Sequence, residues 1–430
     1  MGFLHEHIIL PLSDLLKGEQ VHKYLRLLKK AERWTPEQMS DFQQQKLRQL
    51  LEYAAKEVSF YRDWFLDHNI DPQTATLEQL PIVSKSIMRQ EGIERFTAEH
   101  FPVKQRMYSR SSGSTGEPFS FYVSKEAYSV NTAAKLRTWY QVGYRLGDRY
   151  MKIANGARHG KLKKLQDKIN NCIYVPFYSM GDKTLKEILD KIESSQPSII
   201  RSYPIPLYLL AQYRNNHRDE YHHKPLHVMT TGSTLPAAYR TEIERAFGCD
   251  IIDSYSCEGT ADCYETRAHD GYHITDYYGI IEVLDDNNRP ITDGIGRVVS
   301  TDLWNLAHPF IRYDTQDLVE VRAGRVVRIM GRECESLIDT GKHRYTVHNF
   351  VGFFQEDNRP TKTSVTAYQV VKCKDGSITF RLVVNDQYTP EIEKYIIDFW
   401  QQQLNVSVSV ELVDKIPLMK NNKRLTIVEE

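Results

Sequence analysis

The sequence predicts an α/β protein with a large N-terminal domain, made of α/β layers plus an antiparallel β unit, and a small, mobile α+β C-terminal domain. Short apolar segments alternate with helical stretches between residues 150 and 254, which is typical of a parallel sheet covered by helices on both faces. After residue 274, alternating apolar and polar residues are interrupted by turns, which favours antiparallel strands. Gly331 and Arg332 then precede roughly a hundred residues, enough for a separate unit.

These changes of pattern give the expected domain organisation. Residues 1–100 form a helical region of the N-terminal domain, residues 101–331 form its core, and residues 332–430 form the mobile C-terminal domain. In the first region, apolar residues recur every three or four positions between 17 and 66, the spacing of one buried helix face. Ser84 is the expected N-cap of a later helix.

The expected elements follow the chain in order. The strands of the parallel sheet are expected at 150–154, 198–202, 226–230 and 250–254. Helices are expected at 125–142, 185–194, 206–215 and 237–247. The antiparallel strands are expected at 279–284, 296–300, 309–313, 318–322 and 326–329. The C-terminal domain is expected to contain helices 347–355 and 390–404 and strands 367–372, 379–384 and 408–412.

Composition excludes several classes of protein. The chain has 56 Lys and Arg against 56 Asp and Glu, so no global field favours nucleic acid or an anionic membrane surface, and any such field must be local. No apolar run is long enough to span a bilayer, and Glu6 interrupts what would be a secretory signal. We therefore expect a cytoplasmic protein, whose 6 cysteines are reduced thiols.

A run of hydroxyl and glycine residues lies between two β-prone segments, 105–108 and 119–123. Glycine lets a backbone approach an anion closely, and amide and hydroxyl groups donate hydrogen bonds to phosphate oxygens. The run predicts a phosphate-binding hairpin loop, although such runs also form ordinary solvated turns and this one lacks the Gly-Lys-Ser/Thr ending of a Walker loop. Its residues are Ser111, Ser112, Gly113, Ser114, Thr115 and Gly116.

Four other places carry residues suited to a nucleotide site. One predicted strand ends in the turn 230–233, at the carboxyl edge where α/β sheets bind ligands. The second place is the end of the next strand, near the carboxylate of Glu258. The third is Asp317, whose carboxylate could accept hydrogen bonds from both hydroxyls of a ribose. The last place is the basic turn 417–424. Three of these places also have an ordinary interpretation: a strand-end ion pair for Glu258, a turn cap for Asp317 and a solvated charge for Lys423.

In these residues the chain resembles the adenylate-forming enzymes, and within them the phenylacetate–coenzyme A ligase-like branch that includes the CapK-like members of capsular-polysaccharide operons. The resemblance covers nearly the whole chain, and the motifs occur in the family's order. The matching positions are 51–62, 80–85, 111–116, 232–235, Glu258, 271–273, 309–317, 331–332 and Lys423.

The resemblance implies a two-step reaction. A small aryl, amino or hydroxy acid attacks the α-phosphate of MgATP to form an acyl-adenylate, and a thiol, usually of coenzyme A, then displaces AMP. Thr115 is implied to contact the phosphates, Glu258 to hold Mg²⁺, and Lys423 to bring its ammonium to the carboxylate and the α-phosphate. The implied ATP-binding set is the loop 111–116 together with Ser233, Asp253, Ser254, Tyr255 and, at the ribose, Asp317 and Arg332.

The acyl pocket and a zinc site are further expectations. The acyl pocket is expected at two strand ends, from Tyr203, Pro204, Thr231, Gly232 and Ser233. Some relatives hold a structural zinc nearby, but no Cys-x-x-Cys spacing is present here, so buried thiols are the ordinary interpretation. The zinc candidates are Cys249, Cys257, Cys263, His269 and His273. Relatives are often dimeric, so a homodimer is a possible assembly.

Several departures from the family pattern keep alternatives open. Phe119 follows the loop where a Lys or small polar residue is usual, Gln316 replaces a Gly before Asp317, and Asn422 replaces a Gly before the lysine. Lys420 is therefore a rival to Lys423. The acyl group could instead pass to an amine or hydroxyl in polysaccharide or secondary-metabolite biosynthesis. A relative that binds nucleotide without turnover is the non-enzymatic alternative.

Overall fold

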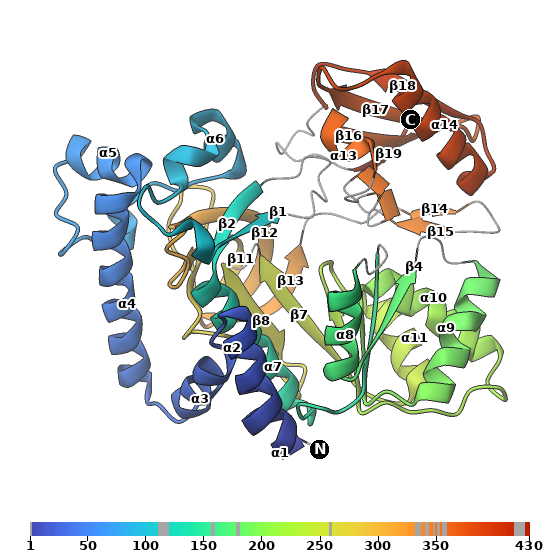
Figure 1. Ribbon diagram of the computed structural model, residues 1–430, viewed down its shortest axis with the longest axis horizontal. Helices are drawn as coiled ribbons and strands as arrows, with labels where there is room; N and C mark the ends of the chain where they lie inside the picture. Colours follow the sequence, from blue (N-terminus) through green and yellow to red (C-terminus); the bar gives the residue numbers. More distant parts are fainter. Residues whose placement is uncertain are drawn as a thin grey trace.

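The computed structural model describes residues 2–110, 120–155, 160–177, 181–257, 260–331, 337–339, 344–346, 349–350, 353–354, 359–416 and 426–430. Figure 1 shows a large N-terminal part, with the C-terminal elements gathered above one side of it. Among the described helices, none is long and apolar enough to cross a lipid bilayer.

Helices make up the first part of the chain, as expected from the apolar spacing. They are α1 (Gly2–Leu4), the π-helix η1 (His5–Ile9), α2 (Leu10–Lys17), α3 (Val21–Ala31), α4 (Pro36–Glu57) and α5 (Ser59–Asp67). Thr35 begins α4 with a capping box, because its hydroxyl accepts from the Gln38 amide and the Gln38 side chain accepts from the Thr35 amide. These caps hold the long helix to a fixed starting point.

Short helices lead from this region to the first hairpin. They are η2 (Leu77–Gln79), α6 (Lys85–Glu91), η3 (Ile93–Phe96) and η4 (Val103–Gln105). The predicted N-cap at Ser84 is confirmed, since its hydroxyl accepts from the Ile87 amide at 3.3 Å. The antiparallel hairpin that follows consists of β1 (Arg106–Arg110) and β2 (Ser120–Ser124).

A mixed sheet forms the centre of the large part, and within the described residues it contains seven strands. In spatial order they are β4 (Cys172–Phe177), β3 (Tyr150–Asn155), β5 (Ile199–Ser202), β6 (His227–Thr231), β7 (Ile251–Cys257), β8 (Ala261–Glu265) and β9 (Tyr272–Ile274). The strands run parallel from β4 to β7, which confirms the predicted parallel sheet, and β8 and β9 continue it antiparallel. The sequence pattern did not predict β4, β8 or β9.

Helices cover both faces of this sheet. One face packs on α9 (Asp182–Ser195), α10 (Pro204–Asn216) and α11 (Ala237–Phe247). The other packs on α3 and on α7 (Lys125–Gln141). A further helix, α8 (Lys161–Ile169), lies beside the edge strand β4 (Figure 1). The predicted helices of this region are therefore confirmed, and α8 is an addition to them.

A second sheet, antiparallel, carries four described strands in the order β10 (Gly279–Leu284), β11 (Gly294–Asp302), β12 (Tyr313–Arg322) and β13 (Arg325–Gly331). The predicted antiparallel unit is confirmed, but the predicted strand 309–313 is wrong. β12 begins only at Tyr313, because Arg312 is in the left-handed conformation with φ 47° and breaks the extended chain. The segment before it is a buried turn that packs on α4 and α5.

The C-terminal elements have their own apolar core, centred on Trp400 and Phe380. In the described part of this region, four strands pair in the order β18 (Val408–Leu412), β17 (Ile378–Val384), β16 (Val365–Lys372) and β19 (Ile427–Glu429). The remaining elements are α13 (Thr361–Ser364), α14 (Pro390–Leu404) and the pair β14 (Leu337–Asp339) and β15 (Arg344–Thr346). The predicted helix 347–355 falls partly outside the described residues.

Candidate functional site

The hairpin β1–β2 connects directly to the hydroxyl-rich loop. Arg110 pairs with Ser120 in the ladder, and the loop residues between them lie outside the described residues. The base of the hairpin is fixed to the rest of the domain, because the Asn305 side chain accepts from the Ser124 amide at 2.9 Å. A loop that joins two paired strands has its ends held about as far apart as neighbouring strands.

A pocket of about 430 Å³ lies between the large part and the C-terminal sheet. Arg89 and Arg110 line it from one side, and Lys362, Asp414 and Lys415 line it from the other. Four cations against one carboxylate among these side chains give the pocket a positive potential, which suits a polyanionic ligand. Burial lowers the pKa of Arg89, so a bound anion would also offset the cost of placing that charge there.

Arg110 offers a specific donor to such a ligand. Its Nε is buried and has no hydrogen-bond partner among the described residues. A buried guanidinium donor without an acceptor is costly and is normally satisfied by a ligand or an ion. Arg110 also immediately precedes the loop 111–116, while Lys415 lies two residues before the basic turn 417–424. The pocket is therefore lined by the described residues nearest in sequence to the hydroxyl-rich loop and to the basic turn.

Asp317 lies in a β-bulge of β12. Asp314 pairs with Val299 and Leu318 with Arg297, so the residues between Asp314 and Leu318 bulge out of the ladder. The Thr315 hydroxyl donates to the Val298 carbonyl at 2.9 Å and secures the bulge.

The bulge brings Asp317 to the end of β7. Tyr255 donates its hydroxyl to Asp317 Oδ2 at 2.9 Å. Burial and the neighbouring Asp317 carboxylate raise the pKa of Tyr255, so the phenol stays protonated and keeps donating. Two residues that the sequence assigned to the ATP site are thus in direct contact, although they are 62 positions apart.

The expected acyl-pocket residues meet at the ends of β5 and β6. Gly232 has φ 82°, and a Cβ there would stand 2.9 Å from the Tyr203 ring, so only glycine allows this close contact. Pro204 begins α10, directly after Tyr203. The Ser233 hydroxyl is buried and has no hydrogen-bond partner among the described residues. It is therefore a polar group that a bound acid could satisfy.

Asp253 belongs to a hydrogen-bond network beneath this edge. It accepts from the Thr230 hydroxyl at 2.5 Å and from the Tyr272 hydroxyl at 2.7 Å, and burial raises its pKa. These bonds tie β6, β7 and β9 together, which supports the strand ends above. Thr231 and Ser254 are register partners at those ends. The ATP-binding roles of Asp253 and Ser254 stay predictions.

The predicted zinc site is not supported. Among the described residues, no group of three or more His, Cys, Asp or Glu side chains could hold a metal ion. The reason is the strand geometry: Cys249 precedes β7 and Cys257 ends it, and His273 pairs with Tyr264, whose side chain is on the opposite face from Cys263. Cys257 and Cys263 are buried cysteines, as the ordinary interpretation expects, and His269 pairs with Glu265 at 3.1 Å.

Several predicted site residues lie outside the described residues, so their roles stay predictions. They are Ser111, Ser112, Gly113, Ser114, Thr115, Gly116, Glu258, Arg332 and Lys423, together with the rival Lys420.

Sequence reasoning missed the cations of the pocket between the two parts. Arg89, Lys362 and Lys415 look like solvated charges when they are read along the chain. The one available signal was Arg110, which stands directly before the hydroxyl-rich loop. Positive residues next to a phosphate-binding loop are common partners of the phosphate.

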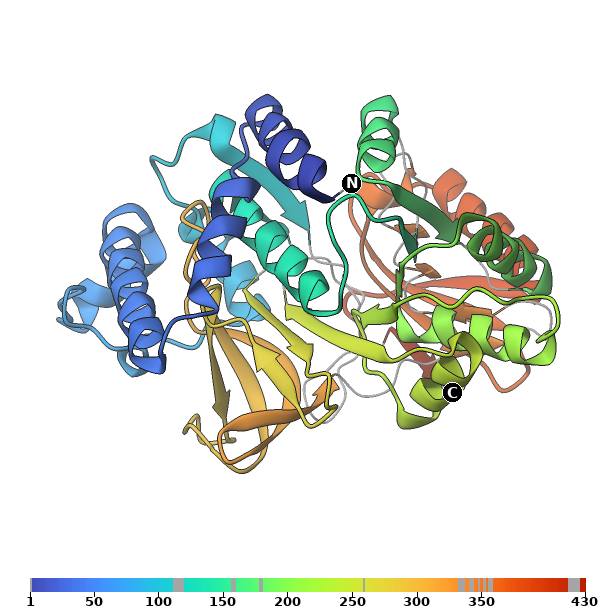
Figure 2. The same ribbon diagram turned by 90° about the horizontal axis from the view of Figure 1, so that it is seen from below.

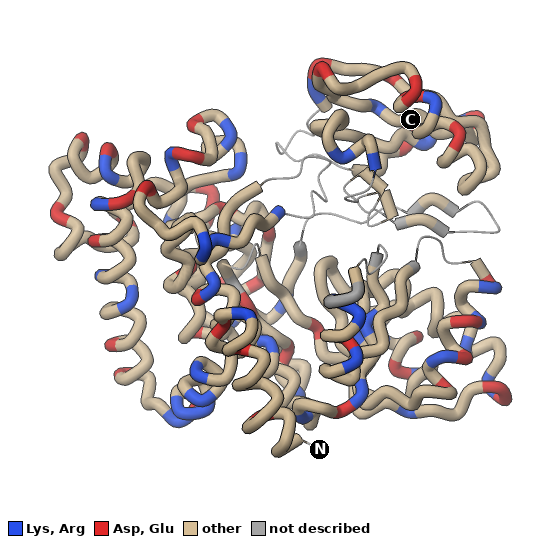
Figure 3. The backbone as a smooth tube through the Cα atoms, viewed as in Figure 1, with Lys and Arg blue, Asp and Glu red and all other residues tan. Residues whose placement is uncertain are grey.

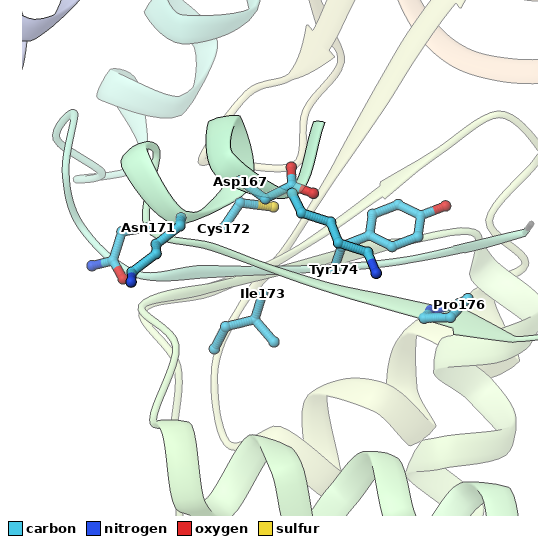
Figure 4. A pocket seen from close by; sticks show the side chains of 8 residues that line it. Asp167, Asn171, Cys172, Ile173, Tyr174 and Pro176 are labelled. Atoms are coloured by element: carbon cyan, nitrogen blue, oxygen red, sulfur yellow. The ribbon is translucent and has the colours of Figure 1, made fainter. Parts of the chain in front are cut away.

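A second pocket, of about 570 Å³, lies between α8 and β4 (Figure 4). Asp167 of α8 and Asn171, Cys172 and Tyr174 line it. Most of this lining comes from α8 and the first half of the edge strand β4, whereas parallel sheets bind ligands beyond their carboxyl ends. We therefore assign the candidate site to the smaller, cationic pocket and to the carboxyl ends of β5, β6 and β7.

Comparisons with known proteins cover most of the chain. No protein-family model matches it. Protein CapK of Staphylococcus aureus is 21% identical over 411 residues, which are 89% of this chain and 88% of CapK. The phenylacetate-coenzyme A ligase of Pseudomonas putida is 27% identical over 367 residues, 78% of this chain and 79% of the ligase.

Solved structures give the same picture for the fold. A 2-hydroxyisobutyryl-CoA ligase in complex with 2-HIB-AMP and CoA matches with a TM-score of 0.59 at 18% identity, over 93% of this chain and 91% of that one. The open conformation of the same ligase matches with a TM-score of 0.53 at 17% identity, over 90% and 91% of the two chains.

Proposed function

We propose that this chain, which has the fold of the adenylate-forming CoA ligases and is homologous to phenylacetate-coenzyme A ligases and CapK, joins a small carboxylic acid to coenzyme A using ATP. The acid displaces pyrophosphate from MgATP to form an acyl-adenylate, and the thiol of coenzyme A then displaces AMP. An aryl, amino or hydroxy acid is the proposed substrate class. Because ATP and coenzyme A are cytoplasmic, we place the reaction in the cytoplasm.

The observation that carries this proposal is the cationic pocket between the two parts of the chain. Arg110 reaches it from the residue before the hydroxyl-rich loop, and Lys415 reaches it from just before the basic turn 417–424. A nucleotide bound here would have its phosphates among cations from both parts. Positive charge on the two sides of a phosphoryl group is the arrangement that phosphoryl transfer requires.

Three residues are proposed to act on the reacting groups. Thr115 donates to the phosphates, and Lys423 brings its ammonium to the acid carboxylate and the α-phosphate. Mg²⁺, when bound near Glu258, neutralises charge on the phosphates. Holding the carboxylate in line with the α-phosphorus converts a bimolecular attack into an effectively unimolecular one.

The nucleoside is proposed to bind beside the end of β7. Asp317 accepts hydrogen bonds from both ribose hydroxyls, and Arg332 binds at the same sugar. The 2.9 Å bond from Tyr255 fixes the Asp317 carboxylate in one orientation before ATP arrives. A preoriented carboxylate loses less entropy on binding than a mobile one. The acid is proposed to bind between Tyr203 and the buried Ser233 hydroxyl.

We propose that residues 332–430 move as a unit about 334–335 between the two half-reactions. Their separate core around Trp400 and Phe380 supports this, because a unit with its own core keeps its shape when it rotates. Such a rotation would withdraw Lys423 after adenylation and open a path for the thiol.

Pyrophosphate exchange into ATP tests the proposal directly. The wild type is assayed against a panel of carboxylic acids that includes phenylacetate and 2-hydroxyisobutyrate, and exchange is expected with at least one acid. Lys423→Ala should lower the rate by about 100-fold or more, because it removes the cation at the reacting centre. Asp317→Ala should lower kcat/KM for ATP by about tenfold or more.

The control is Lys374→Ala, which removes an exposed C-terminal lysine outside the pocket and should leave exchange unchanged. Unaltered exchange in Lys423→Ala with loss in Lys420→Ala would move the catalytic role to Lys420. Absence of exchange with every acid would contradict adenylation by this chain. Product analysis with and without coenzyme A then tests the acceptor, since a thioester forms only with the thiol present.

A further inference from the structure

The N-terminal helices present an apolar surface to solvent. Phe3, Ile8, Leu12, Leu15 and Leu16 are between 55% and 80% exposed. Apart from Phe3, they recur at three- and four-residue spacing, which places them along one side of a helix. Exposed apolar side chains gathered along one side of a helix normally mark an interaction surface.

These helices are fixed in position despite their exposed side. The Asp14 carboxylate accepts from the His22 amide at 2.7 Å and ties α2 to α3. Glu6 pairs with Lys29 and accepts from the Tyr140 hydroxyl at 2.9 Å, which ties η1 to α3 and α7. The apolar stripe is therefore held facing outward by polar bonds on the other side of the helix.

A row of cations runs beside the stripe. The exposed side of α3 carries Lys23, Arg26 and Lys30, and the exposed Arg33 follows the helix, while its opposite side is buried in the core. Figure 3 shows this concentration of positive residues on α3. The whole chain has no net charge, so this is a local field.

The helix α8 extends the same surface. It exposes Leu165 and Ile169 by 53% and 43%, and its exposed lysines include Lys164 and Lys168. It lies close to the N-terminal helices, because a Cβ at Gly147 would collide with the His5 ring and the Gly147 carbonyl accepts from Asn171, just after α8, at 3.0 Å. Figure 2 shows α8 and the N-terminal helices on either side of the N-terminus, at one edge of the molecule.

We propose that the surface formed by η1, α2, α3 and α8 docks onto an anionic lipid bilayer. The apolar side chains enter the boundary between headgroups and acyl chains, while the lysines and arginines lie over the phosphates. Apolar side chains with a basic border are the pattern of helices that lie in a membrane interface. The helices α2 and α3 lie at the far side of the large part from the C-terminal elements (Figure 1), so docking through them leaves the pocket between the parts accessible.

Charge complementarity favours lipid over a second copy of the chain. A symmetric dimer through this face would bring two copies of the basic row together. Three nearby acidic side chains are already engaged with cations: Glu6 with Lys29, Glu19 with Lys17, and Glu32 with Arg137. Anionic headgroups supply the opposite charge that the surface itself does not.

Flotation of the full chain with lipid vesicles tests the proposal. The wild type should float with vesicles of phosphatidylcholine and phosphatidylglycerol, and should remain at the bottom of the gradient with vesicles of phosphatidylcholine alone. Its binding should weaken as the salt concentration rises. The combined change Leu12→Ser, Leu15→Ser, Leu16→Ser should weaken binding by about tenfold or more, because the apolar anchors are removed. The combined change Lys23→Glu, Arg26→Glu, Lys30→Glu should have a similar effect.

Matched controls separate docking from unfolding or general surface effects. Leu66→Ser replaces a leucine that is 72% exposed on α5, and Lys183→Glu with Lys191→Glu reverses exposed charges on α9; both should bind like the wild type. Circular dichroism should show that every variant is folded. Equal binding to neutral vesicles, equal loss in the controls, or no flotation of the wild type would each overturn the proposal. Light scattering that shows a wild-type dimer split by the leucine changes, without lipid binding, would assign the face to a second copy.

Discussion

Two neighbouring residues at the start of β12 adopt the same backbone conformation but have different structural roles. Arg312 and Gln316 stand four residues apart, and both adopt the left-handed conformation, with φ 47° and 61°. The Arg312 guanidinium is buried, bonded to Glu282 at 2.9 and 3.1 Å and to the Leu80 carbonyl at 3.0 Å. Gln316 is half-buried, and its backbone N–H donates to the Asp314 carboxylate at 2.9 Å.

The first residue stabilises the fold, whereas the second positions a side chain of the candidate site. The stretch around Arg312 joins the antiparallel sheet to the segment before α6, so its strain is offset by buried bonds. The stretch around Gln316 makes the bulge that turns Asp317 toward Tyr255, so its strain serves the position of one carboxylate. Glycine should therefore be harmful at the first position and beneficial at the second, although the backbone is the same.

Arg312→Gly should give the largest effect. Glycine relieves the backbone strain, but Glu282 is left buried without its partner, so unfolding by urea should show a loss of about 3–5 kcal/mol. Arg322→Ala, at the exposed end of the same strand, should cost no more than about 1 kcal/mol. Adding Glu282→Gln to Arg312→Gly should recover part of the loss. A loss below about 1 kcal/mol for Arg312→Gly would show that the buried pair is not the support.

The buried segment that contains His308 and Arg312 should also make the free energy of unfolding depend on pH. Burial among Phe96, Phe121 and Phe310 lowers the pKa of His308 to about 3. The unfolded chain takes up this proton below its ordinary pKa near 6.5 while the folded chain does not, so stability is present above that pH and is lost as pH falls toward 3.

The loss between pH 6.5 and 5 should be about 2 kcal/mol from this group. His308→Gln removes the titration, so its urea midpoint should change less over the same interval, whatever its stability at pH 8. His222→Gln, at an exposed histidine, is the control and should keep the wild-type pH dependence. Equal slopes in the wild type and His308→Gln would contradict a neutral, buried His308.

Gln316→Gly should give the smallest effect, and of opposite sign. Relief of the left-handed strain is worth about 1–2 kcal/mol, and the extra freedom of glycine in the unfolded chain takes back about 0.5–1 kcal/mol. We expect a gain of about 0.5 kcal/mol in urea unfolding and unchanged KM for ATP. Ala323→Gly, at another left-handed residue in the turn after β12, is the matched control and should gain similarly. Destabilisation by Gln316→Gly would show that the glutamine side chain itself holds the bulge.

Local pattern predicted much of the fold. The bounds of α11 and α14 agree with the expected 237–247 and 390–404, because both helices show clear apolar spacing and firm ends. The resemblance to adenylate-forming enzymes is confirmed by the homologues and the fold. β4 was missed because Pro176 argues against a strand, yet β4 is an edge strand, where proline is tolerated.

The site was less predictable, because much of it depends on contacts between distant segments. The sequence named Tyr255 and Asp317 separately, but their hydrogen bond depends on a bulge that β11 imposes on β12. Arg89 and Lys415 show no pattern of their own and meet only after the two parts of the chain have folded. The possible zinc site is unsupported for the same reason, since nearness in sequence did not bring the described thiols and histidines into one metal-binding group.

The last strand has a consequence for the proposed lysine. Residues 417–425 are bounded by anchored neighbours: Ile416 is buried on one side, and on the other β19 pairs with β16, with Ile427 opposite Val370. A side chain on a segment secured at both feet explores a smaller volume than one on a free end, so its effective concentration at a fixed target is higher. Ile416, Ile427 and Val370, which belong to no proposed substrate site, would thereby help to set how often the ammonium of Lys423 reaches the acid.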